Sequence, residues 1–179
     1  MKYWLLKTEP EEWSWLQQIK SGNKGTEWNG VRNFQAAKNL KNMKYWLLKT
    51  EPEEWSWQQQ VTSGSKGAEW NGVRNFQASK NLKKMKIADK CFFYHTGKQK
   101  KIIGIVEIIK EHFLDKTDRT CKFSSVTVRA LYPLKREVNL QEIKKNKDFR
   151  DFSLVKQSRL SVMEVDLKYW KKICKMGRV

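Results

Sequence analysis

Cysteine, histidine and long apolar runs are scarce in this chain of 179 residues. Cys91, Cys121 and Cys174 lie far apart and form no Cys-x-x-Cys pair, which excludes a zinc knuckle and a disulfide framework. Free cysteines of this kind indicate a reducing cytosol. No apolar run approaches the roughly 20 residues that span a bilayer, and no basic-then-apolar leader follows Met1. We therefore expect a soluble, cytoplasmic protein without a membrane partner.

Motifs of catalysis and of cofactor binding are missing as well. The segment 64–67 (GSKG) is too short for a phosphate-binding loop and lacks the Gly-Lys-Ser/Thr ending. Two histidines, His95 and His112, cannot supply a histidine-based metal triad by themselves. Cys91 or Ser158 could be paired with His95 as nucleophile and base, but no spacing singles them out. We expect no enzyme activity, no metal and no cofactor.

Acidic residues are too few to balance the basic ones. The chain has 37 Lys and Arg against 19 Asp and Glu, a formal charge of +18. Residues 85–179 carry a net charge of +12, whereas residues 1–42 and 43–84 carry +3 each. Such an excess points to a polyanionic partner, nucleic acid above all. The alternative is a solvated, lysine-rich surface that binds nothing.

The first 84 residues contain the same segment twice. Residues 1–42 and 43–84 are identical at 35 positions, and both begin with MKYWLLKTEPEEWSW. Solenoids need about three or more units, so two copies followed by unrelated sequence do not predict one. We interpret 1–42 as a duplicated extra copy that the fold does not need, and 43–179 as the domain. The alternative is a pair of working half-sites. The copy at 1–42 could also produce a domain-swapped oligomer instead of a monomer.

Hydrophobic periodicity predicts short strands with helices between them. The predicted strands are 44–48, 90–96, 102–113, 124–132 and 158–166. The predicted helices follow Ser56, the Asn71-Gly72 turn, Asn139 and Asp166. The strands look antiparallel, and no strand–helix–strand alternation supports a doubly wound sheet. The pattern predicts the α+β class, with a small, partly open β-barrel and flanking helices.

Each of these four helices carries a more detailed signal. Ser56 and Asn139 are each followed, three residues later, by Gln59 and Glu142, which is the spacing of a capping box. In the helix predicted within 70–85, one face is expected to carry Val73, Phe76, Leu82 and Met85. In the last helix, one stripe is expected to consist of Leu167, Trp170, Ile173 and Cys174.

Aromatic residues are more numerous than one small barrel needs for its core. Several of them stand among residues that can hydrogen-bond a base edge: Trp46, Trp55, Trp57, Trp70, Phe76, Phe93 and Tyr94 lie among Lys49, Arg74, Asn75, Gln77 and His95. An aromatic wall beside amide and imidazole groups is how proteins hold an unstacked or flipped base. The alternative is that these rings only fill the core.

Four motifs over residues 43–179, in the order MKYWLLKTEPEEWSW, WNGVRNFQA, FFYHT and LVKQSRLSV, resemble the EVE domain family. This family is part of the PUA-like superfamily, with the YTH-type readers of methylated adenine and the animal thymocyte nuclear protein, whose pocket is associated with modified cytosine. The resemblance implies a PUA-like barrel, no catalysis and a pocket for a modified base in DNA or RNA. The alternative is a general RNA-binding accessory protein with a vestigial pocket.

The resemblance also implies the residues of a modified-base pocket. They are Lys49, Thr50, Trp70, Val73, Arg74, Asn75, Gln77, Tyr94, His95, Ser158, Arg159, Leu160 and Ser161. Trp70 would be the stacking surface, and Asn75 and Gln77 would hydrogen-bond the base edge. Arg74 or Arg159 would hold a phosphate or a neighbouring carboxylate. For Arg159, a buried pair with an acid such as Glu51 is the alternative.

Overall fold

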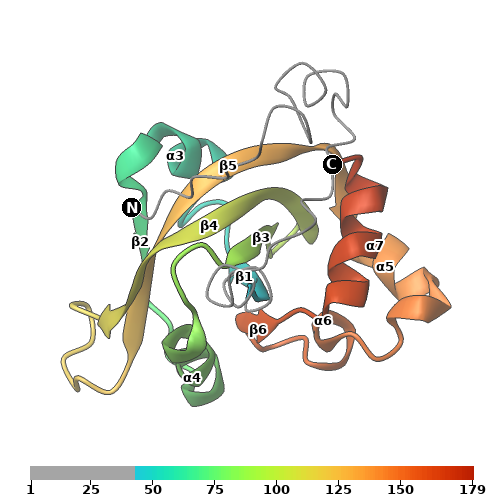
Figure 1. The fold of residues 1–179 in the computed structure, drawn as a ribbon. Coiled ribbons are helices and arrows are strands. Elements are labelled where there is room, and N and C mark those ends of the chain that lie inside the picture. Colours follow the sequence, from blue (N-terminus) through green and yellow to red (C-terminus); the bar gives the residue numbers. More distant parts are fainter. Residues whose placement is uncertain (1–42) are drawn as a thin grey trace, which may run out of the picture. The chain divides into compact units, whose positions relative to one another are not determined.

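Six strands form one mixed sheet in the computed structural model, which describes residues 43–179 (Figure 1). Their order across the sheet is β2-β5-β4-β3-β1-β6. The strands are β1 (Tyr45–Thr50), β2 (Ala68–Trp70), β3 (Lys90–His95), β4 (Lys101–Leu114), β5 (Ser124–Asn139) and β6 (Val162–Glu164). The two predictions about the copy at 1–42, that the fold does not need it and that it permits domain swapping, lie outside the described residues.

Helices lie between the strands and against the sheet (Figure 1). They are α3 (Trp57–Thr62), the 3-10 helix η2 (Gly64–Lys66), α4 (Phe76–Lys84), α5 (Leu140–Lys145), the 3-10 helix η3 (Lys147–Phe149), α6 (Ser153–Lys156) and α7 (Leu167–Gly177). Among the residues from Met43 onward, none of these helices has the length and apolar composition required to cross a bilayer.

The sheet curls because its longest strands are irregular. The pairing of β3 with β4 shifts register once, and that of β4 with β5 shifts several times. Such bulges bend the bulged strand and increase the local twist, and β4 and β5 appear as long curved strands in Figure 1. The predicted α+β class and partly open barrel are confirmed. The expectation of antiparallel pairing fails at β1 and β3, which run parallel from Tyr45↔Lys90 to Thr50↔His95.

Aromatic residues of the core pack against the sheet. The Trp170 ring of α7 stacks on Phe92 with 4.0 Å between centroids, and on Tyr45 with 4.4 Å. Trp46 is fully buried, and its indole Nε1 donates to Asp89 Oδ2 at 2.9 Å. These four rings therefore fill the core, which was the alternative interpretation of the aromatic excess.

Local capping signals were partly correct. At α3 the capping box is complete: Ser56 Oγ accepts from the Gln59 backbone N–H, and the Gln59 side chain accepts from the Ser56 N–H at 2.8 Å. Asn139 and Asp166 occupy the N-cap positions of α5 and α7, but their side chains make no cap hydrogen bond. Glu142 instead accepts from Arg136 at 2.6 Å, so the second capping box is not formed.

Several predicted boundaries were wrong. The helix predicted after Asn71-Gly72 begins only at Phe76, which is 69% exposed and does not share a buried face with Leu82 and Met85. Strand β2 was missed, as were α6 and both 3-10 helices. The strand predicted over 158–166 is reduced to β6, and 158–161 form a loop. In contrast, β5 continues through Pro133 to Asn139, because Pro133 is exposed and lies at one of the register shifts.

We propose that residues 43–179 fold without the first copy. All six strands and the described core lie in this segment, which forms a compact unit by itself. Deletion of residues 1–42 is therefore expected to leave a cooperative thermal transition, to be measured by circular dichroism for the shortened and the full chain. Loss of that transition on deletion would mean that the first copy supplies part of the structure.

Candidate functional site

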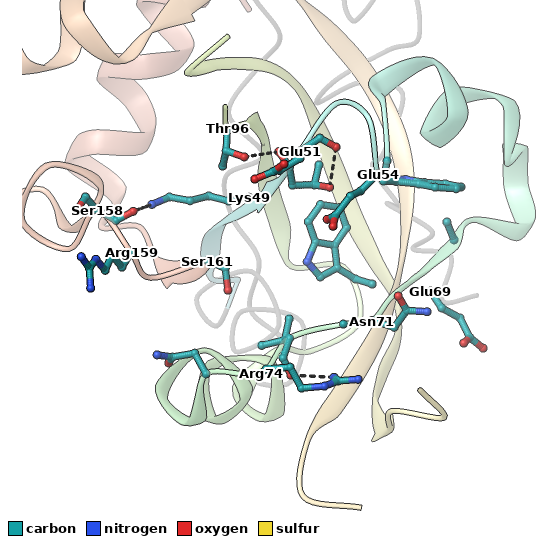
Figure 2. A pocket seen from close by; sticks show the side chains of 17 residues that line it. Lys49, Glu51, Glu54, Glu69, Asn71, Arg74, Thr96, Ser158, Arg159 and Ser161 are labelled. Atoms are coloured by element: carbon teal, nitrogen blue, oxygen red, sulfur yellow. Dashed lines mark hydrogen bonds between the residues drawn. The ribbon is translucent and has the colours of Figure 1, made fainter. Parts of the chain in front are cut away.

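A cavity of about 870 Å³ lies where the end of β1, the loop after β2 and the loop before β6 meet (Figure 2). Its volume is within the range of small-ligand sites, about 300–1,000 Å³. It is lined by Lys49, Thr50, Glu51, Glu54, Trp55, Ala68, Glu69, Trp70, Asn71, Gly72, Val73, Arg74, Asn75, Thr96, Ser158, Arg159 and Ser161.

Most of the residues that the sequence motifs singled out border this cavity. Those that do are Lys49, Thr50, Trp70, Val73, Arg74, Asn75, Ser158, Arg159 and Ser161. Gln77, Tyr94, His95 and Leu160 are not in its lining. Gln77 points along α4, where its Nε2 donates to Asn81 Oδ1 at 3.3 Å. Tyr94, His95 and Leu160 are buried in the protein interior.

Eight lining residues were not in the predicted pocket: Glu51, Glu54, Trp55, Ala68, Glu69, Asn71, Gly72 and Thr96. Glu51, Glu54 and Trp55 belong to the KTEPEEW segment, so their position in a motif was a signal that sequence reasoning could have used. Ala68 and Glu69 lie on β2, which the sequence did not reveal.

The two tryptophans of the cavity differ in how they are held. Trp70 is only 6% exposed, and its ring packs edge-on against Phe93 with 5.6 Å between centroids. Trp55 is half-buried, and its indole Nε1 donates to Gln60 Oε1 at 3.0 Å. Gln60 is fully buried and donates in turn to the Val128 carbonyl at 3.0 Å. Trp55 is thus fixed in orientation and more accessible than Trp70, which makes it the better-placed stacking surface.

Arg74 and the loop around it are tied to the β4–β5 hairpin by one buried carboxylate. Asp115 accepts from Arg74 Nη1 at 2.8 Å, from the Gly72 N–H at 2.9 Å, and from the Thr117 hydroxyl at 2.6 Å and its N–H at 2.8 Å. Burial alone would raise the pKa of Asp115, but these hydrogen bonds outweigh it and lower the pKa to about 2. The sequence predicted that Arg74 would hold either a phosphate or a neighbouring carboxylate. In the structure Arg74 holds a neighbouring carboxylate, that of Asp115.

Lys49 joins the opposite wall of the cavity to the loop before β6. Its Nζ donates to the Ser158 carbonyl at 2.9 Å, and its backbone N–H donates to the Ser161 carbonyl at 2.9 Å. Figure 2 shows the side chain extended from β1 toward Ser158. Burial disfavours the charged form and lowers the pKa of Lys49 to about 8.

Three other predicted side chains have definite surroundings. Arg159 is exposed, and among residues 43–179 it forms no ion pair, so the buried pair with Glu51 is not present. Asn75 caps α4, since its Oδ1 accepts from the Ala78 N–H at 2.9 Å. The His95 Nδ1 lies 2.8 Å from Gln99 Oε1, and its buried Nε2 has no hydrogen-bond partner in the described part of the chain.

The cavity mixes charges of both signs. The carboxylates of Glu51, Glu54 and Glu69 share the lining with Lys49, Arg74 and Arg159. Carboxylates repel a phosphate but accept hydrogen bonds from an amino group, so this lining suits a neutral, polar, planar ligand better than an anion. Residues 43–179 contain no group of three or more His, Cys, Asp or Glu side chains arranged to hold a metal ion.

Comparison with known proteins gives consistent matches. The EVE domain family model matches residues 2–45 and 44–176. Thymocyte nuclear protein 1 of mouse (Mus musculus) is 35% identical over 167 residues, covering 79% of this chain and 55% of that protein. The chain therefore spans about half the length of this curated relative.

Two solved structures have the same curled sheet with flanking helices. A protein of Agrobacterium tumefaciens is 41% identical, with a TM-score of 0.72 over 75% of this chain and 92% of that chain. Human thymocyte nuclear protein 1 in complex with DNA containing 5-methylcytosine is 25% identical, with a TM-score of 0.70 over 76% of this chain and 98% of that chain. The expected PUA-like architecture is thereby confirmed.

Proposed function

The chain belongs to the EVE domain family, and we propose that it binds nucleic acid by holding one modified base in the cavity beside β1. The observation that carries the proposal is the cavity itself, in which Trp55 and Trp70 stand beside carboxylate, amide and ammonium groups. A solved relative of the same fold is in complex with DNA that contains 5-methylcytosine. We therefore take 5-methylcytosine as the first base to test.

The chemistry of the lining fits a base better than a phosphate. The flat face of the base would stack on Trp55, which Gln60 holds in place. A carboxylate such as Glu51 or Glu54 would accept from an exocyclic amino group, the contact that acidic side chains make with cytosine. Val73 offers an apolar surface for a methyl group. The phosphates would then remain outside, near exposed basic side chains.

A general RNA-binding function with a vestigial pocket is the second candidate. It is favoured by the net charge of +18, most of which lies in residues 85–179. A protein that contacts only the backbone loses affinity steeply as salt rises and ignores base modification. A base reader instead retains its preference for the modified base at both low and high salt.

Trp55→Ala is expected to weaken binding of the modified base by about 1–3 kcal/mol, the size of one base–aromatic stack. The measurement is fluorescence anisotropy with DNA and RNA oligonucleotides that are identical except for one 5-methylcytosine, at two salt concentrations. The wild-type chain should prefer the modified oligonucleotide, and the variant should bind both forms alike. Lys144→Gln, on α5 and outside the cavity, serves as the matched control and should weaken both forms equally. If Trp55→Ala also weakens both equally, the protein is a general binder.

Affinity is expected to fall between pH 7 and pH 9. The charged Lys49 is the form that donates to an acceptor on the base, so bound ligand raises the pKa of Lys49 above its free value of about 8. Binding then takes up a proton, and affinity declines by up to about tenfold per pH unit above 8. Lys49→Arg keeps its charge throughout this range, and its affinity should not change with pH. A wild-type profile as flat as that of Lys49→Arg would contradict the role of Lys49.

A further inference from the structure

An exposed aromatic residue lies directly beside the cavity. Phe76 is the first residue of α4, follows the lining residue Asn75, and is 69% exposed. Its ring packs on Phe123, at the base of the β4–β5 hairpin, with 5.0 Å between centroids and an angle of 34°. Phe123 is itself only 8% exposed. Phe76 therefore has one face supported by the protein and the other available to a ligand.

The support behind Phe76 is connected to the cavity wall. The Arg74 guanidinium lies 5.7 Å from the Phe123 ring centroid, while its Nη1 donates to Asp115. Arg74, Phe123 and Phe76 thus form a continuous row that leads outward from the cavity. A ligand seated in the cavity and extending past Arg74 would reach Phe76 next.

The hairpin beside this row is organised by a second buried carboxylate. Asp118 accepts from the backbone N–H groups of Thr120, Lys122 and Phe123 at 2.8–2.9 Å and from the Thr120 hydroxyl at 2.7 Å. With both of its aspartates buried in such contacts, the hairpin presents only basic charge to solvent: exposed Lys116, Arg119 and Lys122. Lys116 is 79% exposed and lies 3.6 Å from Glu69. Arg119 and Lys122 form no ion pair with any described residue.

We infer that Phe76 and the 115–123 hairpin form a strand-contact surface for the nucleotide next to the one in the cavity. The neighbouring base would stack on Phe76, and the hairpin's basic side chains, with Lys80 one turn along α4, would face the phosphates. This charge is complementary to nucleic acid and unsuited to an apolar protein partner. The inference rests on the proposed function, because it assumes a base in the cavity.

The test compares a ligand that has a neighbouring base with one that has none. The probes are 5-methyl-2′-deoxycytidine monophosphate and a short single-stranded DNA with one central 5-methylcytosine, both titrated into the full chain. Phe76→Ala should lower affinity for the oligonucleotide about 5- to 150-fold, the range of one base–aromatic stack, and leave affinity for the mononucleotide unchanged. Phe76→Tyr keeps the ring and should bind as the wild type does. Leu167→Ala is the matched control, since Leu167 is also an exposed apolar first residue of a helix, at 49% exposure.

The outcomes separate this surface from the reader function. If the wild-type chain prefers the modified oligonucleotide and Phe76→Ala does not change the affinity, the strand-contact surface is overturned and the reader function stands. Equal binding of modified and plain oligonucleotides, both weakened by Phe76→Ala, supports the surface and overturns the reader. If Phe76→Ala lowered affinity for the mononucleotide and the oligonucleotide equally, Phe76 would belong to the cavity itself and the strand-contact surface would be overturned. A dimer in light scattering that Phe76→Ala dissociates would also overturn it, in favour of an interface between copies.

Discussion

Gly67→Ala is expected to destabilise the protein by about 3 kcal/mol or more, because it combines a forbidden backbone conformation with a steric overlap. Gly67 has φ +66° and ψ −170°, a region that only glycine adopts readily. A Cβ built there would overlap the Val128 carbonyl oxygen and lie 2.7 Å from Ile109 Cδ1. Relief requires β2 to move away from β5, and β2 carries Trp70 into the cavity. Urea denaturation followed by circular dichroism measures the change.

Gly64→Ala is the matched control for that substitution. Gly64 also has a positive φ, +56°, but a Cβ there meets nothing within 4 Å. Gly64→Ala should therefore lower the free energy of unfolding only by the strain of a left-handed backbone, about 1 kcal/mol. If the two variants were equally stable, the close approach of β2 to β5 at Gly67 would not be a constraint on the fold.

Asp115→Ala should destabilise the protein by about 2–3 kcal/mol, since it removes one partner of a buried pair and leaves several donors unpaired. The value lies below the range for fully buried pairs, because the Arg74 side chain is 43% exposed and partly hydrated. The 71–75 loop should also lose its tether, so binding of a modified oligonucleotide should weaken together with stability. Urea denaturation and anisotropy are measured on the same preparations.

The effect of Asp115 should depend on pH in a known direction. Its pKa is lowered from 3.8 to about 2 on folding, so the ionised carboxylate stabilises the native state above pH 4. That contribution is lost as the pH falls from about 4 to about 2, and the stability gap between wild type and Asp115→Ala should narrow over this interval. The pKa of Asp118 is lowered as well, chiefly by the Thr120 hydroxyl, but Asp118 is present in both proteins and cancels in the difference. If the stability difference stayed constant over this interval, these contacts would not be lowering the pKa of Asp115.

Local sequence signals predicted what depends on local interactions. The KYWLL run correctly predicted β1, and the Ser56/Gln59 spacing correctly predicted the start of α3. Both signals consist of residues close together in the chain. Strand β2 has only three residues and exists because it pairs with β5, about 58 residues away. No periodic pattern can develop over three residues, so the sequence could not reveal it.

The start of α4 shows how two valid signals compete. Asn71-Gly72 reads as a turn that begins a helix, but Asn75 supplies the cap that the helix uses. The later start places Phe76 on the first turn, exposed, instead of on the buried face. Motifs nevertheless located most of the candidate cavity, since each motif contributes a segment to its wall. Asp115 had no signal of its own, because its importance comes from Gly72 and Arg74, more than 40 residues earlier in the chain.

The central claim is that a modified base enters the cavity beside β1, and nuclear magnetic resonance tests it most directly. The ¹⁵N-labelled full chain is titrated with two oligonucleotides that differ by one methyl group on a cytosine, and the two sets of shifts are subtracted. We predict that the differences concentrate at the indole N–H of Trp55 and at the backbone amides of Gly72 and Ser161, which line the cavity. Differences that are absent, or that fall only on the lysine-rich helices α5 and α7, would contradict the account.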